Sequence, residues 1–331
     1  MDILTQGVIG ATVAQTAAKK EHLRLATFVG FLSGILADAD VLIRSATDPL
    51  LSLEYHRHFT HSIFFIPFGA LVAFLLLWPF LRKKLSAQYL YFYCFLGYLF
   101  SGFIDACTSY GTHLLWPLMG ERISWHIISI IDPIFTVCLL IGIIIGFKTL
   151  RPVYARAGLL LAASYLVFAT FQLQRAEQSI YELAEQRNHK IEKIMVKPTM
   201  GNTVLWRSVY LSDKHFYIDS VRTGLDKRVY TGTSIEQFDL NKSFPAIDKN
   251  TTLYSDIKRF ENFSDGYVSF YPEKRNILGD VRYSMNPLSP IPLWGIEMNL
   301  DEPEQHVKYE FYRASSKEMR QQFIDMLLDK N

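Results

Sequence analysis

The stretch "IFTVCLLIGIIIGF", residues 134–147, runs for 14 residues without a charged side chain. Such a segment is hard to place in water, and a helix needs roughly 20 apolar residues to cross a bilayer. Similar runs recur through the first half of the chain. Including the one around the quoted stretch, they cover residues 3–18, 25–43, 63–81, 88–107, 133–150 and 154–171. We therefore expect an α-helical multi-pass membrane domain of about five to six helices.

The composition changes after about residue 175, where the chain becomes an ordinary soluble mixture. A polar, helix-forming lead-in at 172–194 is followed by short runs of alternating polarity, and residues 317–328 read as a closing amphipathic helix. Alternation with Gly, Asp, Asn and Pro between the runs indicates an antiparallel sheet. We expect residues 1–174 to form the membrane domain and 175–331 a soluble β-rich (α+β) domain. The runs are "TVLWRSVYL", "HFYIDSVR", "DGYVSFYP", "DVRYSMN" and "HVKYEFYR".

Charge and cysteine content argue against nucleic-acid binding and against a disulfide framework or thiolate metal site. The net charge of the 331 residues is only +2, and no basic tract carries interleaved aromatic residues, so nucleic acid is not an expected partner. The three cysteines, Cys94, Cys107 and Cys138, lie in apolar segments and form no CxxC pair. We read them as packing residues rather than as a disulfide framework or a thiolate metal site.

The loop charges predict the orientation in the membrane. Positive residues concentrate on the cytoplasmic side of membrane proteins. One set of connections is rich in them, and the opposite set carries only Arg44, Arg57 and Arg122. We expect a bacterial inner-membrane protein with the N-terminus, residues 44–62, residues 108–131 and everything beyond 175 outside the cytoplasm. The rich set is Lys19, Lys20, Arg24, Arg82, Lys83, Lys84, Lys148, Arg151 and Arg156.

The first apolar segment is read as a retained helix rather than as a signal peptide. A signal peptide carries its positive charges before the apolar stretch. Here Asp2 precedes the segment, and Lys19 and Lys20 follow it.

Histidine and carboxylate residues gather at the outer ends of the expected helices. Ionisable groups at that depth are costly unless they pair or bind something, so they are functional candidates. Together they form the ligand set of a divalent metal ion, with zinc preferred and manganese or magnesium as alternatives. The candidate ligands are Asp38, Asp40, His56, His58, His61, Asp105, His126 and Asp132.

Several candidates also have a plain structural interpretation. Asp132 precedes Pro133, which suits a helix N-cap followed by an N1 proline. Asp38 and Asp40 are two positions apart and cannot share one helical face. Arg57 could neutralise the acidic cluster, hold an anionic substrate or serve as an ordinary surface residue. Four further histidines, His22, His113, His189 and His215, are read as solvated.

At these residues the sequence resembles the YdjM-like membrane-bound metal-dependent hydrolases. Members of that family open with an Asp-x-Leu-Thr-His-type start, and they carry acidic, histidine, Asp-Thr-Tyr-Gly and Ile-Ile-Asp-Pro segments in the same order. The resemblance covers roughly residues 1–171 and continues more loosely into "NTVLWR" and "FSDGY". The matching segments here are "MDILTQGVIGA", "ADADVL", "HRHFTHS", "IDACTSYGTHLLWP" and "IIDP".

The resemblance implies a metal or catalytic role for Asp38, Asp40, His56, His61, Asp105 and Asp132. This chain departs from the family pattern at Gln6 and Ser101, where histidines are usual. It also has Ala37 in place of a proline and His58 in place of a glycine. The departures imply a reduced or rearranged site, with His58 or His126 as substitute ligands.

These residues suggest three candidate functions, of which the third fits least well. The first is a metal-dependent hydrolase acting on a membrane lipid or lipid-linked phosphoester or ester, with Asp105 or Asp38 accepting a proton. The second is a non-catalytic membrane scaffold or regulator with a degenerate metal site, which the change to Gln6 and Ser101 favours. The third, a haem carrier, needs facing histidine pairs within the bilayer, whereas these histidines lie at its edge among carboxylates. The sequence identifies no protein partner.

Overall fold

The computed structural model describes residues 1–313 and 316–330, and the chain divides into two compact units. The first unit comprises Met1–Leu42, Tyr55–Phe171 and Met200–Thr203. The second comprises Ile43–Glu54, Gln172–Thr199 and Val204–Asn331.

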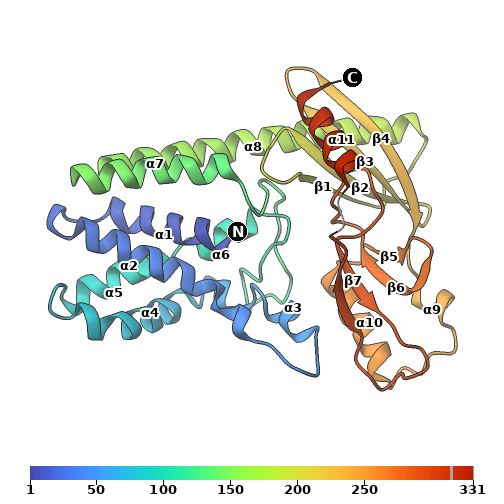
Figure 1. Cartoon of the computed structure of the whole chain (residues 1–331), viewed down its shortest axis with the longest axis horizontal. Helices are drawn as coiled ribbons and strands as arrows, with labels where there is room; N and C mark the ends of the chain where they lie inside the picture. Colours follow the sequence, from blue (N-terminus) through green and yellow to red (C-terminus); the bar gives the residue numbers. More distant parts are fainter. Residues whose placement is uncertain (314–315, 331) are drawn as a thin grey trace. The chain divides into compact units, whose positions relative to one another are not determined.

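The first unit is helical, and its helices follow the expected apolar runs (Figure 1). Short stretches of 3-10 helix join several of them. The elements are α1 (Ile3–Thr16), η1 (Lys20–His22), α2 (Leu23–Leu36), η2 (Ala37–Leu42), η3 (Phe59–His61), α4 (Ile66–Leu81), α5 (Ala87–Tyr98), α6 (Ser101–Ala106), α7 (Pro133–Thr149) and the first part of α8 (Val153–Gln186).

Fewer of these helices than expected are long and apolar enough to cross a bilayer. Among the described residues, Lys20–Leu42 and Val153–Gln186 meet both conditions. A third span results if Leu51–His61 and Ile66–Leu81, bent by 92°, count as one. The helical character of the membrane region is confirmed, whereas the expected number of five to six spanning helices is not.

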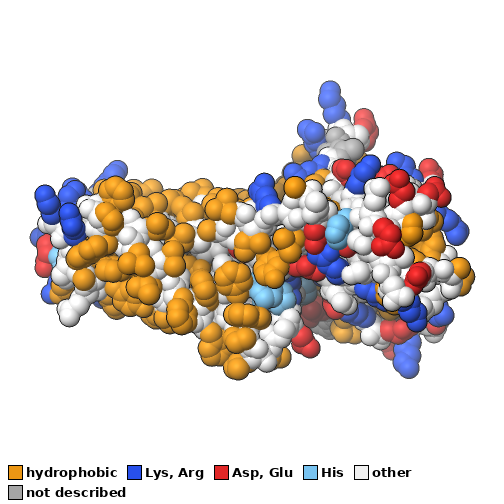
Figure 2. All heavy atoms as spheres, turned by 90° about the horizontal axis from the view of Figure 1, so that it is seen from below, with side chains coloured by type: hydrophobic (Ala, Val, Ile, Leu, Met, Phe, Trp, Pro, Cys, Tyr) orange, Lys and Arg blue, Asp and Glu red, His pale blue; other side chains and the backbone are white. Residues whose placement is uncertain are grey.

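Apolar side chains cover the outside of the first unit, and polar ones are buried inside it. Figure 2 shows hydrophobic side chains over most of its visible face. Leu76 and Phe80 of α4 and Leu160 of α8 are more than half exposed, while Thr12 and Gln15 of α1 are fully buried. The interior also contains apolar clusters, so it is the apolar outer surface that fits a lipid surrounding.

Small residues allow the helices at the centre of this unit to touch backbone to backbone. A Cβ on Gly10 of α1 would overlap the carbonyl oxygen of Gly30 in α2, and a Cβ on Gly97 of α5 would approach that same oxygen. Without a hydrophobic force between helices in lipid, such close van der Waals contact drives their association. The glycines at these positions therefore allow the close packing of α1 against α2 and α5.

The second unit is built on two four-stranded antiparallel sheets with strands in sequence order. The second sheet packs on α10, together with Leu50 and Leu53. The first sheet consists of β1 (Lys193–Pro198), β2 (Leu205–Ser212), β3 (His215–Thr223) and β4 (Lys227–Glu236). The second consists of β5 (Val268–Tyr271), β6 (Lys274–Asp280), β7 (Trp294–Glu297) and β8 (Lys308–Phe311), and the helices are α3 (Leu51–Tyr55), α9 (Leu240–Ser243), α10 (Thr252–Phe263) and α11 (Lys317–Leu328).

Most of the expected soluble elements are confirmed, including the closing helix α11. The segment "DVRYSMN" is an exception, because β6 ends at Asp280 and the chain turns there. The side chain of Arg282 folds back onto Asp280, with Nη2 2.7 Å from Oδ2, and donates to the carbonyl of Phe263. A local ion pair therefore takes the place of continued strand pairing.

The two faces of the first sheet are covered differently. One face packs against apolar residues of α8, including Ala176 and Ile180. The other face packs Val209 and Ile218 against Tyr267 and Val281. At one end of this second face the apolar contacts give way to a basic pair, because Lys197 lies directly across from Arg207 in the β1–β2 register.

The Lys197–Arg207 pair makes the stability of this unit depend on pH. Burial beside Arg207 lowers the pKa of Lys197 to about 7, whereas an unfolded lysine titrates near 10.4. The unfolded chain therefore holds more protons between these values, and stability rises with pH from about 7 to 10.

We expect the melting temperature of the wild type, relative to that of Lys197→Met, to rise between pH 7 and 9. The difference in unfolding free energy between the two proteins can rise by at most about 1.4 kcal/mol per pH unit, because one titrating group is involved. The measurement is thermal unfolding of the detergent-purified chain in buffers without phosphate or sulfate. All other titrating groups are shared by the two proteins, so a difference that does not change with pH contradicts the prediction.

Candidate functional site

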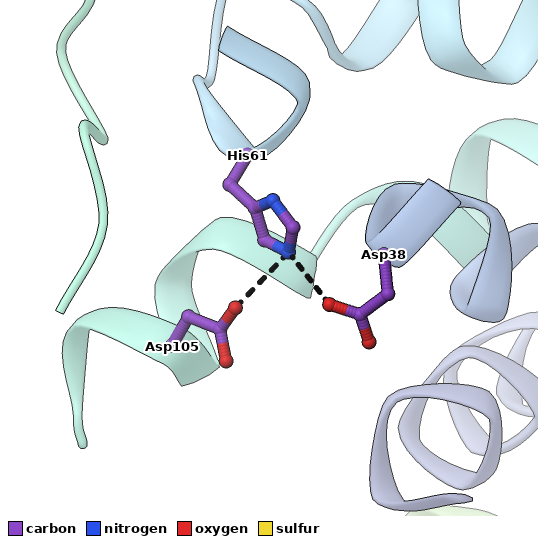
Figure 3. A group of neighbouring side chains, drawn as sticks. All are labelled: Asp38, His61 and Asp105. Carbon is purple, nitrogen blue, oxygen red and sulfur yellow. Dashed lines mark ion pairs between the residues drawn. The ribbon is translucent and has the colours of Figure 1, made fainter. Parts of the chain in front are cut away.

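Three separate segments bring a histidine and two carboxylates together in the first unit (Figure 3). Asp38 comes from η2, His61 from η3 and Asp105 from α6. The Nε2 atom of His61 lies 3.4 Å from Oδ1 of Asp38 and 3.0 Å from Oδ2 of Asp105. One donor atom from each residue lies within 4.8 Å of the other two.

The donor atoms of this cluster are buried, and several lack hydrogen bonds. His61 is 1% exposed, Asp105 0% and Asp38 7%. Among the described residues, both carboxylate oxygens of Asp38, Nε2 of His61 and Oδ2 of Asp105 have no hydrogen-bond partner. Asp105 takes part in ion pairs, whereas the carboxylate of Asp38 has only His61 as an ion-pair partner among the described residues, at 3.4 Å. A buried carboxylate with so little compensation is costly. A divalent cation bound among these atoms would supply the missing positive charge, so the donor set fits a metal ion.

Asp40 holds the opposite side of the His61 ring. Its Oδ2 lies 3.5 Å from His61 Nδ1 and accepts a hydrogen bond from the hydroxyl of Thr60 at 3.0 Å. Its Oδ1 lies 3.1 Å from Nδ1 of His56. A carboxylate behind a histidine fixes the ring and raises its basicity, as is usual around metal-binding histidines. Asp38 and Asp40 thus face the site differently, as their spacing in sequence required.

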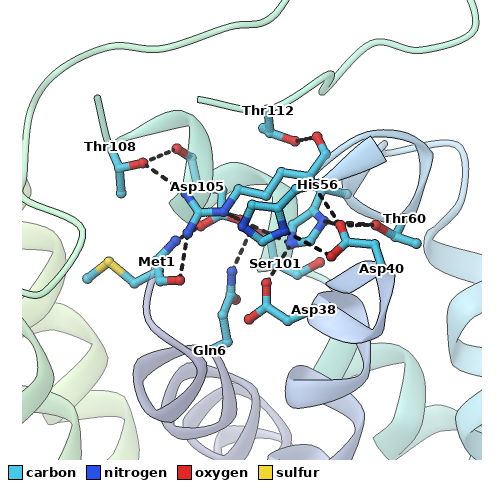
Figure 4. Close-up of polar contacts among 12 residues, drawn as sticks. Met1, Gln6, Asp38, Asp40, His56, Thr60, Ser101, Asp105, Thr108 and Thr112 are labelled. Carbon is cyan, nitrogen blue, oxygen red and sulfur yellow. Dashed lines mark hydrogen bonds and ion pairs between the residues drawn. The ribbon is translucent and has the colours of Figure 1, made fainter. Parts of the chain in front are cut away.

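Hydrogen bonds and ion pairs connect the residues around Asp40 and Asp105 (Figure 4). Arg57 joins these two carboxylates through both its backbone and its side chain. Its φ of 58° is left-handed, and its backbone N–H donates to Asp40 Oδ2 at 2.6 Å. Its guanidinium lies 3.2 Å from Asp105 Oδ2 and donates to the backbone carbonyl of Met1 at 2.8 Å. The residue is 4% exposed, so the surface interpretation of Arg57 is wrong.

The α-amino group of Met1 forms a second buried ion pair with Asp105. Asp2 then caps α1 by accepting from the backbone N–H and hydroxyl of Thr5. Nothing in the sequence pattern pointed to Met1, because a terminal amine carries no motif.

The two departures from the family pattern meet in this site. Gln6 donates from Nε2 to the backbone carbonyl of Ser101 at 3.2 Å, and both residues are buried. Oε1 of Gln6 has no hydrogen-bond partner among the described residues. The amide therefore lies in the place that the resemblance assigned to a histidine.

The remaining candidates lie in other surroundings, and their roles as ligands stay predictions. Asp132 caps α7, accepting from the N–H of Phe135 and, at 3.0 Å, from the hydroxyl of Tyr165. The ring of His58 lies 4.4 Å from that of His113. His126 has a left-handed φ of 55°.

His113 belongs to the aromatic surroundings of His58. Burial, with the positive charge of Arg122, lowers the pKa of His113 to about 4. Its imidazole is therefore neutral at physiological pH. The residue is partly buried, so it is less solvated than we expected.

A second grouping of possible ligands lies in the second unit, at Asp48, Asp256 and His306. The guanidinium of Arg259 lies 2.8 Å from Asp48 and 2.9 Å from Asp256. A side-chain cation therefore already neutralises this group.

Gly102 controls how closely η3 approaches α6. A Cβ at this position would overlap the backbone carbonyl oxygen of His61, so His61 reaches Asp105 only because residue 102 has no side chain. No motif in the sequence indicated this.

We expect Gly102→Ala to displace His61 and to destabilise the protein by about 1–3 kcal/mol, as overpacking usually does. The matched control is Gly120→Ala, where an added Cβ meets nothing within 4 Å. Both variants are compared with wild type by thermal unfolding in detergent. Equal melting temperatures for the two variants would show that the contact does not constrain η3.

One of three comparisons with known proteins found a match, and that match covers the helical unit that contains this site. None of the curated proteins and none of the solved structures matches the chain. The family model described as "YdjM inner membrane protein" matches residues 1–176, which include every residue of the cluster. That match covers more than half of the 331 residues. The chain therefore belongs to the YdjM inner membrane protein family.

Proposed function

We propose that the protein is a membrane-bound metal-dependent hydrolase acting on a lipid or lipid-linked phosphoester or ester. One observation carries the proposal. A histidine and two carboxylates from three segments converge with buried donor atoms that lack hydrogen bonds. Nitrogen and oxygen donors of this kind suit zinc, with manganese or magnesium as alternatives.

In this proposal Asp38, His61 and Asp105 hold the ion, and Asp40 orients His61 from behind. When bound, a divalent ion polarises the scissile group and lowers the pKa of a nearby water molecule. The second carboxylate oxygen of Asp38 has no hydrogen-bond partner among the described residues and can accept a proton. The buried guanidinium of Arg57 can stabilise negative charge that develops on a phosphoester.

The membrane placement supports a lipid substrate. Leu42 and Ile63, close in sequence to Asp40 and His61, are exposed apolar residues, so a lipid tail could lie beside the polar cluster. The charged connections that follow α1, α4 and α7 lie at the opposite ends of these helices from the cluster. By the positive-inside rule this charge distribution supports our proposal that the protein is multi-pass and that the cluster faces the extracytoplasmic side. We propose the same side for the β-rich unit.

A specific observation also favours a non-catalytic scaffold as the second candidate. Arg57 and the α-amino group of Met1 already give Asp105 two positive partners. Gln6 is a neutral amide. A site satisfied by its own cations would need no metal ion, and the β-rich unit would then serve partner binding.

Metal content distinguishes the two candidates. We expect near-stoichiometric zinc or manganese in the detergent-purified wild type and its loss in His61→Ala and Asp105→Ala, because each variant removes one ligand. The control is His22→Ala, since His22 lies at the other end of α2 against Tyr89. The measurement is elemental analysis after dialysis against metal-free buffer.

The same preparations are then tested for release of phosphate from mixed micelles of phosphatidic acid and of phosphatidylglycerol phosphate. Metal-dependent release that His61→Ala abolishes supports the hydrolase. Absence of metal from the wild type, even after supplementation, would overturn it and leave the scaffold.

Asp40→Asn tests the positioning role of the carboxylate behind His61. The amide keeps the shape but loses the charge, so we expect metal affinity to fall about 10- to 100-fold, as is typical when such partners are changed. The measurement is a zinc titration of metal-free protein against a competing chelator. Asp2→Asn, which alters a helix cap outside the ligand set, is the control and should bind as wild type does. Unchanged affinity in Asp40→Asn would remove Asp40 from the site.

A further inference from the structure

A row of polar side chains crosses one face of the first sheet in the β-rich unit. The strand registers place Lys197 opposite Arg207, Arg207 opposite Ser220 and Ser220 opposite Tyr230. Directly opposed residues of an antiparallel sheet point to the same face, and neighbouring strands lie about 4.8 Å apart. Two cations therefore stand side by side, with a serine next to them.

Arg207 is a buried guanidinium held by neutral groups alone. It is 2% exposed and donates to the backbone carbonyls of Val281 at 2.8 Å, Pro287 at 2.7 Å and Asn286 at 3.3 Å. Among the described residues its Nε has no hydrogen-bond partner, and the same is true of the buried hydroxyl of Ser220. Two unpartnered polar groups thus occupy neighbouring positions.

Lys197 also lacks a carboxylate partner among the described residues. Its ammonium lies 4.2 Å from the ring centre of Tyr283. The nearby carboxylate, Asp280, receives Arg282 through Nε at 2.9 Å and Nη2 at 2.7 Å. Three cations, Lys197, Arg207 and Arg282, therefore share one carboxylate, and that carboxylate is already engaged.

Like charges directly opposite each other destabilise a sheet, and buried cations are costly without a partner. We propose that Lys197 and Arg207 form an anion-binding site of the β-rich unit, which takes the phosphate group of a phosphoester or free phosphate. A tetrahedral oxyanion accepts several charge-assisted hydrogen bonds at once. Arg207 Nε, the Lys197 ammonium and the Ser220 hydroxyl supply such donors.

The same pair accounts for the lowered pKa values in this region. Burial lowers the pKa of Arg207 to about 9 and that of Lys197 to about 7. An anion bound between them would favour both charged forms. The site is built from residues of the β-rich unit alone, so it stands independently of the proposed hydrolase.

The test is isothermal titration calorimetry of the detergent-purified full chain at pH 6.5 and constant ionic strength. The probes are inorganic phosphate, dihexanoyl phosphatidylglycerol and, as its zwitterionic counterpart, dihexanoyl phosphatidylcholine. Lys197→Met removes the ammonium but keeps an apolar stem, and Lys197→Arg keeps the charge. Lys193→Met is the matched control, because Lys193 is on the same strand and face but is paired with Asp265 at 2.8 Å.

We expect saturable phosphate binding that weakens at least about tenfold in Lys197→Met, since a charge-assisted contact is lost. Lys197→Arg and Lys193→Met should bind as wild type does. The same pattern with phosphatidylglycerol alone also supports the site and identifies a lipid headgroup as the source of the phosphate.

Three results overturn the proposal. The first is equal weakening in Lys193→Met and Lys197→Met, which indicates general attraction to a basic surface. The second is wild-type binding in Lys197→Met, and the third is no binding of any probe. A buried water between Arg207 and Ser220 then accounts for the unpartnered atoms. None of these outcomes depends on metal at His61, so the two proposals fail separately.

Discussion

The buried carboxylates of the first unit are the constraint on which its structure depends. Asp38, Asp40 and Asp105 are each at most 7% exposed, and a charge at that depth must be compensated by nearby groups. The compensation comes from segments far apart in the chain. The three segments η2, η3 and α6 therefore have to meet. Each supplies some of the charged or ionisable side chains, and no segment supplies both the carboxylates and their partners.

Arg57 carries much of this compensation, and its backbone conformation explains how. A left-handed φ of 58° turns its N–H toward Asp40 while its side chain extends to Asp105 and Met1. A non-glycine residue in that region is strained. The strain is tolerated because one residue then satisfies two buried carboxylates from opposite directions. Its carbonyl accepts from Thr112, which ties the 108–131 segment to the same point.

The sequence predicts where the helices lie better than where they end or which contacts they make. The run 25–43 ends as α-helix at Leu36, and the run 154–171 continues as α-helix to Gln186. Apolar runs located α1, α2, α4, α7 and α8, and the family motifs collected Asp38, His61 and Asp105 at one end of them. Three features had no sequence signal. Residue 102 has to be glycine because a side chain there would overlap the backbone carbonyl oxygen of His61, which is 41 positions earlier in the chain. The length of continuous helix that can span a bilayer was overestimated, because α5 and α6 are separate helices. The turn after Asp280 depends on a side-chain ion pair that overrides an alternating pattern.

The positions of Gln6 and Ser101 bear on whether a metal ion remains at this site. The two residues are in contact, so both departures from the family pattern lie at the same point beside the cluster. A glutamine amide keeps a polar group at the same place, and its free Oε1 is a neutral oxygen donor. In the metal site proposed above, a neutral oxygen would therefore stand beside one histidine and two carboxylates where the resemblance implies an imidazole. Such an oxygen donor suits harder cations better than an imidazole does.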